Sequence, residues 1–422
     1  MKLSNWFLIA SLYVTQFLPV SFFFMGLPAI LRAQGRTLEE IGALYLLGFV
    51  WVLKILWAPA VDRISFGRLG HYRGWLILMQ MAMIAMLLLI GQIDGFAHFP
   101  LLVLLGLVLT VFSATQDIAA DAIACRLLPA ELRGIGNSLQ VAGGLVGIVL
   151  GGGATLTLFP LLGWAGCFCL MAAVLACCLV QVVLFKEPFV EGPKIVDAGY
   201  ARIWRVWRQP GMANWAGLMM IVPFGIGMVF AILSPMLVDV GWSLEAVGFT
   251  LNIVGSLVGL VAVCATGFLI RRFGRRRMLV AAAFLQAAVI LTVLPLAGGA
   301  RETLVIVPGL ILVFLVYNPI AAVMLTIMMD RAASGSEGTD FTAQYSLYSF
   351  MGFLAGAAAL QIASATGYQA LVLLAAGLAF LAGLLALWRF RPYSAEGEVW
   401  TPPEALARGA ITRDHSTAFP PT

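Results

Sequence analysis

The chain has 422 residues, of which 62% are hydrophobic and 11% are charged, with a formal net charge of +5 and a mean hydropathy of +0.99. A soluble globular protein carries about 25% charged residues, so this composition excludes a water-soluble fold that must cover its own surface with polar groups. Apolar runs of about 20 residues, each able to cross about 30 Å of hydrocarbon, instead predict an all-α polytopic membrane protein.

The apolar runs predict twelve transmembrane helices. In chain order they cover residues 5–30, 41–61, 74–93, 99–125, 134–158, 164–185, 211–237, 246–270, 277–296, 304–329, 341–363 and 368–389. The first run is longer than the apolar core of a signal peptide, so we expect it to remain as a helix. The chain then divides into an N-terminal half, a cytoplasmic middle loop, a C-terminal half and a cytoplasmic tail, at residues 1–185, 186–210, 211–389 and 390–422.

Lysine and arginine set the predicted orientation. With the N-terminus in the cytoplasm, 21 of the 25 basic residues fall on the cytoplasmic side and 3 on the other, while Lys54 lies within a span. Basic residues concentrate on the cytoplasmic side of membrane proteins, so both termini are expected in the cytoplasm. The same rule accounts for the positive net charge, which indicates a lipid bilayer and no nucleic acid as partner.

One short phrase occurs in both halves of the chain. GRTLEEIG at residues 35–42 returns as GWSLEAVG at residues 241–248, just before spans two and eight. Thr37 and Ser243 are predicted N-caps of those helices. Six spans separate the two copies, so both halves enter the membrane in the same orientation. This indicates a parallel repeat about an axis along the membrane normal.

Charge within the spans predicts a site. Lys54 lies about 20 Å into span two, and Asp117 and Asp121 lie late in span four, at a compatible depth. A buried charge in a membrane helix usually faces a partner or a water-filled cavity. Two interpretations stay open: a structural ion pair that makes Lys54 tolerable, and a proton-linked switch in which one aspartate takes up a proton.

The loops after spans two and eight are also similar to each other. APAVDRISFGR (58–68) and GFLIRRFGRRRM (267–278) each place a basic, Gly-containing turn between the second and third helix of a half. This pair resembles the loop motif of the major facilitator superfamily, although Arg271 stands where the second copy would carry an acid. The resemblance implies two parallel, pseudo-symmetric six-helix halves and a gating contact for the acid at 62. The candidate cytoplasmic gate residues are Asp62, Arg63, Gly67, Arg68 and Arg126.

Further stretches resemble one branch of that superfamily. LKILWAPAVDR (53–63), HYRGW (71–75), ATQDIAADAI (114–123) and LLPAELRG (127–134) look like the muropeptide permease and acetyl-CoA transporter branch. Within it, the chain length and GTDFTAQYSLYSF (338–350) resemble bacterial siderophore permeases of the rhizobactin and pyochelin type, whereas muropeptide permeases tend to be longer.

The resemblance implies a transporter in the bacterial inner membrane that works as a monomer. It would import a siderophore or its ferric complex by alternating access, coupled to protons. The alternative substrate is a muropeptide or another cell-wall or acyl metabolite. In this superfamily the first, fourth, seventh and tenth helices line the cavity. The candidate substrate contacts are Tyr13, Gln16, Asn137, Tyr317, Asn318 and Tyr345, although an interhelical hydrogen bond or an interface anchor is the more common role for any single one of them.

Other classes of site find little support in the sequence. The six cysteines lie in or beside apolar helices and the three histidines are far apart in the predicted topology, so no metal and no cofactor are expected. No GxxxxGK[ST] motif for ATP binding occurs. A polytopic membrane enzyme is the remaining rival, but the two aspartates of span four lie beside a lysine and without metal ligands, so we expect no enzyme activity.

Overall fold

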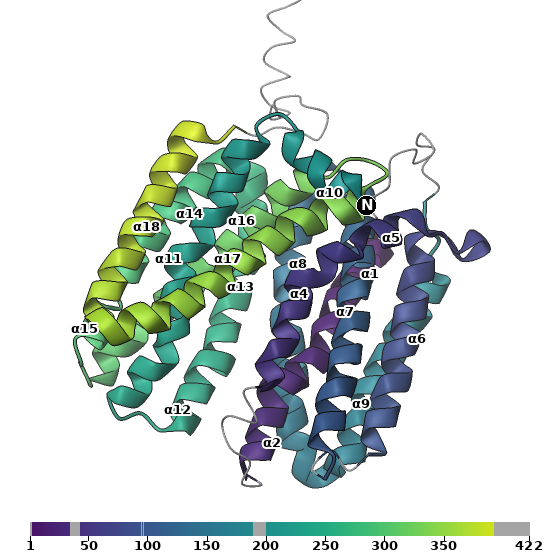
Figure 1. The fold of residues 1–422 in the computed structure, drawn as a ribbon, viewed down its shortest axis with the longest axis horizontal. Coiled ribbons are helices and arrows are strands. Elements are labelled where there is room, and N and C mark those ends of the chain that lie inside the picture. The colour runs from purple at the N-terminus through teal and green to yellow at the C-terminus, as the bar shows by residue number, and fades with distance from the viewer. Residues whose placement is uncertain (1, 34–42, 94, 96, 189–199, 392–422) are drawn as a thin grey trace, which may run out of the picture.

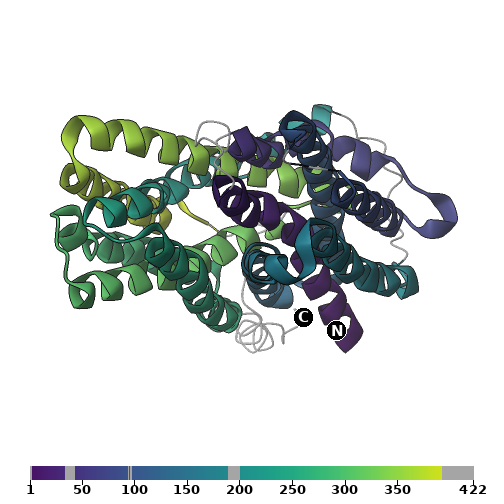
Figure 2. The same cartoon turned by 90° about the horizontal axis from the view of Figure 1, so that it is seen from below.

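The computed structural model describes residues 2–33, 43–93, 95, 97–188 and 200–391. The regular elements of these residues are all helical. Figure 1 shows two bundles, with the first half of the chain in purple and blue and the second half in teal to yellow. Seen from below, in Figure 2, the two halves again lie side by side.

The first half contains α helices joined by short 3-10 and π turns. The α helices are α1 (Leu3–Ser21), α2 (Leu27–Ala33), α4 (Val50–Leu53), α5 (Ala58–Arg63), α6 (Tyr72–Gly91), α7 (Phe99–Leu127), α8 (Arg133–Ile148) and α9 (Thr155–Leu184). A π turn at Phe22–Gly26 joins α1 to α2, and another at Val149–Ala154 joins α8 to α9. Gly163, with φ 63°, breaks α9 into two helices, which separates spans five and six.

A short linker helix and the second half follow. They comprise α10 (Ala201–Arg205), α11 (Met212–Asp239), α12 (Leu244–Gly248), α13 (Gly255–Phe273), α14 (Arg275–Leu291), α15 (Leu294–Ala297), α16 (Thr303–Asp330), α17 (Glu337–Thr366) and α18 (Tyr368–Arg389). A π turn at Phe249–Val254 joins α12 to α13. The chain enters α11 through Gly211, whose φ of 70° is a left-handed conformation that glycine adopts without strain.

The predicted set of spans is confirmed among the described residues. Ten helical stretches are long and apolar enough to cross a membrane. One of them, residues 130–184, is 55 residues long and contains two spans separated at Gly163. Predicted span two corresponds to the helical segments between Ala43 and Arg63, which contain the shorter apolar stretch Leu47–Leu56, so all twelve predicted spans have helical counterparts among the described residues. Its helix is interrupted by a 3-10 turn at Lys54–Leu56, directly before Pro59, whose ring nitrogen has no hydrogen to donate back to that turn.

The second copy of the repeated phrase begins a helix as predicted. The hydroxyl oxygen of Ser243 accepts a hydrogen bond from the backbone N–H of Ala246 at 3.1 Å, which is an N-cap contact at the start of α12. The first copy, at residues 35–42 with Thr37, lies outside the described residues.

Glycines allow α8 to pack closely on α1. A Cβ added at Gly143 would lie 2.7 Å from Cβ of Tyr13, and one at Gly147 would lie 2.7 Å from Cβ of Phe17. One added at Gly151 would overlap the carbonyl of Leu18. The four-residue spacing of these glycines thus brings two helix backbones together, as small residues do in membrane bundles.

The two halves touch along two seams. The helix α8 packs against α13 and α16, and α17 packs against α4, α5 and α7. The N-terminus and the end of α18 lie at the same end of the molecule, at the top of Figure 1. We call this end the closed end, because Asp62, Arg126, Asp330 and Glu337 join the halves there.

Candidate functional site

The buried charges predicted in the first half form an ion pair. The Nζ atom of Lys54 contacts Oδ2 of Asp117, and both side chains are almost completely buried. Lys54 is presented by the 3-10 turn that interrupts span two, and Asp117 by α7. A buried lysine and aspartate offset each other's charge, so the pair makes each of them tolerable within the membrane.

The two aspartates have different partners. The other carboxylate oxygen of Asp117 accepts a hydrogen bond from Nε2 of Gln16 at 2.6 Å. Asp121 accepts hydrogen bonds from the hydroxyl of Tyr13 and from Nε2 of Gln140, both at 2.9 Å and both on its Oδ1 atom. Its Oδ2 atom is buried and has no hydrogen-bond partner among the described residues. Asp121 is therefore held by neutral donors, whereas Asp117 is held by a cation.

The site also touches the second half of the chain. The ammonium of Lys54 lies 4.3 Å from the ring centroid of Tyr345, on α17. This is within the range of a cation–π contact. Lys54 thus interacts with an anion from its own half and an aromatic ring from the other. The site brings together helices α1, α7, α8 and α17 with span two.

The remaining predicted substrate contacts lie elsewhere. Asn137 donates to the carbonyl of Arg133 on its own helix, and Asn318 fits against Gly259 of α13. Asn137 also lies 3.5 Å from Sδ of Met329 on α16, so each of the two asparagines contacts a neighbouring helix, and a role in substrate binding stays a prediction. Tyr317 stacks on the ring of Phe230, with centroids 4.7 Å apart.

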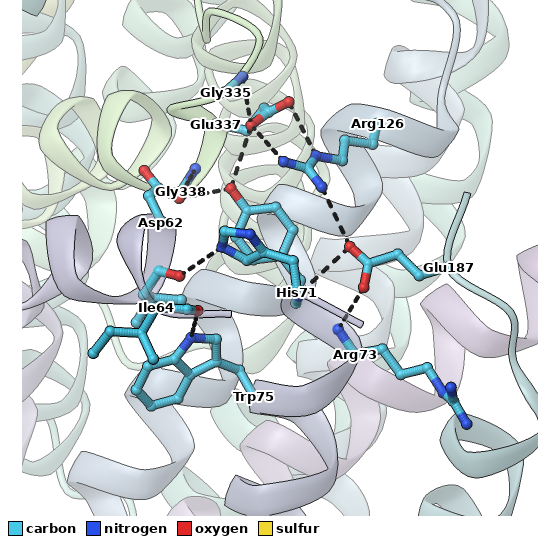
Figure 3. A network of polar contacts seen from close by, with 12 residues as sticks. Asp62, Ile64, His71, Arg73, Trp75, Arg126, Glu187, Gly335, Glu337 and Gly338 are labelled. Atoms are coloured by element: carbon cyan, nitrogen blue, oxygen red, sulfur yellow. Dashed lines mark hydrogen bonds and ion pairs between the residues drawn. The ribbon is translucent and has the colours of Figure 1, made fainter. Parts of the chain in front are cut away.

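At the closed end, Asp62 binds the start of α17. Its carboxylate accepts hydrogen bonds from the backbone N–H groups of Gly338 and Thr339, at 3.1 and 2.7 Å, and from the hydroxyl of Tyr72 at 2.7 Å. A carboxylate at a helix N-terminus binds N–H groups that have no partner within the helix, and it is favoured by the helix dipole. Asp62 from one half therefore caps a helix of the other half (Figure 3).

Arg126 makes the next contact between the halves. Its guanidinium pairs with Glu337 at 3.1 Å and with Glu187 at 3.2 Å, and it lies 4.3 Å from the centroid of the Tyr72 ring. Glu187 in turn accepts hydrogen bonds from the backbone N–H groups of Tyr72 and Arg73 at the start of α6. As Figure 3 shows, one arginine holds together α7, the segment after α9 and the start of α17.

A second ion pair, between Arg133 and Asp330, also joins the halves, and its two residues stand at the repeat positions of Glu337 and Arg126 with the opposite charges. Arg133 of the first half lies 3.1 Å from Asp330 of the second, and Arg275 lies 2.8 Å from the same carboxylate. Asp330 is 204 residues after Arg126, and Glu337 is 204 residues after Arg133. The pairs Arg126–Glu337 and Arg133–Asp330 therefore occupy equivalent places in the internal repeat, with opposite polarity.

Three of the predicted gate residues do not join the halves. Arg63 and Arg68 are exposed, and no ion pair links either of them to another described residue. Gly67 begins a 3-10 turn with φ 59°, where a residue with a side chain would be strained. The predicted gating contact was assigned to Asp62 alone, and a gate role for these three residues stays a prediction, since the loop carries them toward water.

Several contacts at this end were not predicted. The residues that make them all lie at helix ends or next to them: Tyr72, Glu187, Asp330, Glu337 and the pair Arg202–Asp340. Charged residues are ordinary at helix ends, so their type alone gives no signal. One sequence feature could have identified two of these residues. Glu337 and Asp340 are acidic residues in the first turn of a helix, where the helix dipole favours negative charge.

The comparisons with known proteins identify the family and the fold of the chain. The model of the Major Facilitator Superfamily matches residues 9–360, which is most of the chain. The chain belongs to this superfamily. Among solved structures, the human organic anion transporter MFSD10 superposes on this facilitator with a TM-score of 0.73 at 16% identity, covering 92% of this chain and 100% of that one. The transporter FucP in its outward conformation gives 0.69 at 14% identity, covering 92% and 99%.

Two curated relatives of this facilitator carry more specific names. The anhydromuropeptide permease of Escherichia coli K12 is 31% identical over 277 residues, which cover 64% of this chain and 56% of the permease. The putative transporter AmpG 4 of Rickettsia conorii is 24% identical over 264 residues, covering 60% and 63%. The matched region of this facilitator thus spans little more than half the length of these relatives.

The ion pair between Arg126 and Glu337 at the closed end can be tested directly. Changing Glu337→Gln removes a charged partner of Arg126, and loss of such a bond costs about 1–3 kcal/mol. We expect the closed end to open more often, which exposes the buried thiol of Cys125 next to Arg126. In a variant that keeps only this cysteine, labelling by a water-soluble maleimide should accelerate about tenfold. Glu302→Gln, at an exposed carboxylate, is the control. Equal labelling rates in both variants would contradict the proposed gate.

Proposed function

We propose that this protein is a secondary transporter that moves a muropeptide across the bacterial inner membrane by alternating access, driven by protons. Its membership of the superfamily supports transport. The names of its curated relatives support the substrate, and they favour the muropeptide alternative over siderophore import. We further propose that it works as a monomer with both termini in the cytoplasm, which the distribution of lysine and arginine supports.

The observation that carries the mechanism is the position of Lys54. It binds Asp117 of its own half and faces Tyr345 of the other, so a change of charge at the site acts on a contact between the halves. Alternating access consists of the movement of one half against the other around a central site. A proton taken up beside this pair changes the charge next to a contact between the halves, which links protonation to their relative arrangement.

The count of charges supports Asp121 as the proton site. Two carboxylates and one ammonium leave one negative charge in a buried setting, where an uncompensated charge is costly. Asp117 has Lys54 as its counter-ion, whereas Asp121 has only hydroxyl and amide donors. In our proposal Asp121 binds the transported proton, and Asp117 holds Lys54 in place.

A muropeptide fits the chemistry of the same region. It combines a sugar with a short peptide, and the peptide ends in carboxylates. Lys54, paired with Asp117, and the aromatic face of Tyr345 lie together next to the seam where the halves meet, and protonation of Asp121 leaves this group of residues without net charge. Ligand sites in proteins usually combine such apolar surfaces with a small number of placed polar groups.

The test is uptake by the full chain reconstituted in liposomes. With a more acidic outside, radiolabelled anhydromuropeptide should accumulate inside above its outside concentration, and a protonophore should abolish this accumulation. A labelled ferric siderophore serves as the second substrate and should not accumulate. Accumulation of the siderophore with no uptake of the muropeptide would reverse the assignment.

A further inference from the structure

A cluster of polar side chains lies inside the first half, among the helices α1, α6, α7 and α9, which pack on one another (Figure 1). Its members are linked by side-chain hydrogen bonds, and the transport mechanism proposed above uses none of them. They are Ser11, Thr15, Gln80, Gln116, Cys178 and Gln181. Polar groups inside a membrane bundle are costly unless each is hydrogen bonded, so every donor and acceptor of this cluster needs a partner.

The thiol of Cys178 lies at the centre of this cluster. Its Sγ atom accepts a hydrogen bond from Nε2 of Gln80 at 3.2 Å and donates one to the hydroxyl of Ser11 at 3.4 Å. Sγ also lies 3.7 Å from the hydroxyl oxygen of Thr15, which accepts a hydrogen bond from Nε2 of Gln116 at 3.5 Å. The amides of Gln80 on α6 and Gln116 on α7 therefore reach the same thiol and hydroxyl from two helices.

The carbonyl oxygens of these two amides have no donor. Oε1 of Gln80 and Oε1 of Gln116 are buried, and neither accepts a hydrogen bond from a described residue. The nearby hydroxyl hydrogens are already in use, since Thr15 donates to the backbone carbonyl of Ser11 at 2.8 Å and Ser11 donates to Oε1 of Gln181 at 2.6 Å. Buried side-chain oxygens without a donor are rare in folded proteins, because each loses the hydrogen bonds that water gave it.

Rotation of the amides does not supply the missing donors. Nε2 of Gln116 also donates to the backbone carbonyl of Leu12 at 3.3 Å, so a rotated amide would place two oxygens against each other. A rotated Gln80 would bring its oxygen to the thiol, and its nitrogen would then take the place of the unpaired oxygen. Interhelical hydrogen bonding, an ordinary role of glutamine in membrane helices, therefore accounts for the nitrogen atoms and not for the oxygen atoms.

The missing partner must be small, neutral and able to donate hydrogen bonds. The cluster consists of amides, hydroxyls and a thiol that keeps its hydrogen in the contact with Ser11, so it has no net charge to attract an ion. A water molecule has two hydrogens to donate, one for each of the two carbonyl oxygens. Internal waters in proteins make about three hydrogen bonds, typically to buried polar groups that have no other partner.

We propose that the first half holds an internal water molecule, which donates hydrogen bonds to the carbonyl oxygens of Gln80 and Gln116 beside the thiol of Cys178. Such a water joins α6 to α7, and the thiol connects both helices to α1 and α9. Gln116 directly precedes Asp117 of the buried ion pair, so the water also helps to hold α7 in place at that pair. The proposal depends neither on the substrate of the transporter nor on its coupling to protons.

X-ray radiolytic footprinting of the full chain in detergent tests this proposal. A short X-ray pulse turns water into hydroxyl radicals, which oxidise a buried thiol quickly where a bound water lies beside it. Cys178 is the probe and Cys167 the control, because both are buried on α9 and Sγ of Cys167 lies against the backbone carbonyl of Thr155, outside the cluster. The exposed thiols are removed by Cys169→Ala and Cys177→Ala in every protein, so that mass spectrometry assigns the oxidised residue.

Two matched variants complete the design. Gln80→Leu/Gln116→Leu replaces both amides by apolar side chains and so removes the partners of the water. Gln286→Leu removes a buried glutamine of α14 in the second half, whose amide donates to the backbone carbonyl of Val222. The second variant therefore measures the effect of losing a buried glutamine at a place away from the cluster.

We expect Cys178 to be oxidised severalfold faster than Cys167 in the parent protein and in Gln286→Leu, and no faster than Cys167 in the double variant. Equal rates for the two thiols in the parent protein would overturn the proposal, because no water would then lie beside Cys178. A fast rate that persists in the double variant would also overturn it, because the amides would not hold the water. If the double variant does not fold, Gln80→Leu and Gln116→Leu decide singly, and each should slow the oxidation of Cys178 severalfold.

Discussion

Breaking the pair between Lys54 and Asp117 is expected to lower the stability of the folded protein by about 3–5 kcal/mol, because it leaves a buried charge without compensation. Asp117→Asn leaves the buried ammonium of Lys54 without its counter-ion, and Lys54→Met leaves the buried carboxylate of Asp117 without its counter-ion. Each single change should lower both the detergent-extracted yield and the melting temperature. The combined change removes both charges together, so it should recover most of the loss.

The controls for this result are changes of the same kind at exposed positions. Asp239→Asn alters a carboxylate that bonds the hydroxyl of Tyr368 at the surface, and Lys186→Met alters an exposed lysine. Neither should change the melting temperature measurably. If the single changes in the pair are as mild as these controls, the contact has no structural role. A double variant no more stable than either single one would mean that the two residues act separately.

Asp121→Asn is expected to abolish proton-driven accumulation while leaving a folded transporter that still exchanges substrate. An asparagine oxygen can accept the same hydrogen bonds from Tyr13 and Gln140, so the local structure should persist. A side chain that is permanently neutral cannot carry a proton between the two sides. The ratio of inside to outside substrate should then fall to about one, since an uncoupled carrier only equilibrates its substrate.

Two measurements on the same liposomes separate this result from a loss of folding. Uptake against a pH gradient should disappear in Asp121→Asn, whereas counterflow of labelled against unlabelled substrate at equal pH should remain. Gln140→Leu is the matched change, because it removes a donor to Asp121 and keeps the carboxylate. Accumulation at the wild-type level in Asp121→Asn would move the proton site to another residue. The loss of counterflow as well would indicate damage to the substrate pathway.

The fold could be predicted from the sequence because the membrane restricts the possible structures. A run of apolar residues long enough to cross the hydrocarbon must form a helix, so the length of each run sets the span. The predicted ends of span twelve, 368 and 389, coincide with those of α18. The break at Gly163 was also placed correctly, since the predicted spans five and six end and begin on either side of it.

The site was predictable where charge is rare and not where it is common. Lys54 and Asp117 stand out because a charged residue within a span costs free energy. A residue of opposite charge was therefore expected beside each of them. Glu337 and Asp330 gave no such signal, because their partners Arg126 and Arg133 lie about 200 residues away and all four are at helix ends. Local patterns do not encode which helix ends meet. The family motif pointed to the contact of Asp62, and the loop arginines Arg63 and Arg68 of the same motif are exposed to water.

The exchanged polarity of the two ion pairs has a consequence for which halves can pair with each other. A molecule made of two copies of the first half would place Arg126 opposite Arg133, and one made of two copies of the second half would place Asp330 opposite Glu337. Like charges would then face each other at both contacts. Opposite charges meet at the closed end only when a first half pairs with a second half. These complementary charges therefore favour the pairing of unlike halves over a symmetric pairing of two like halves.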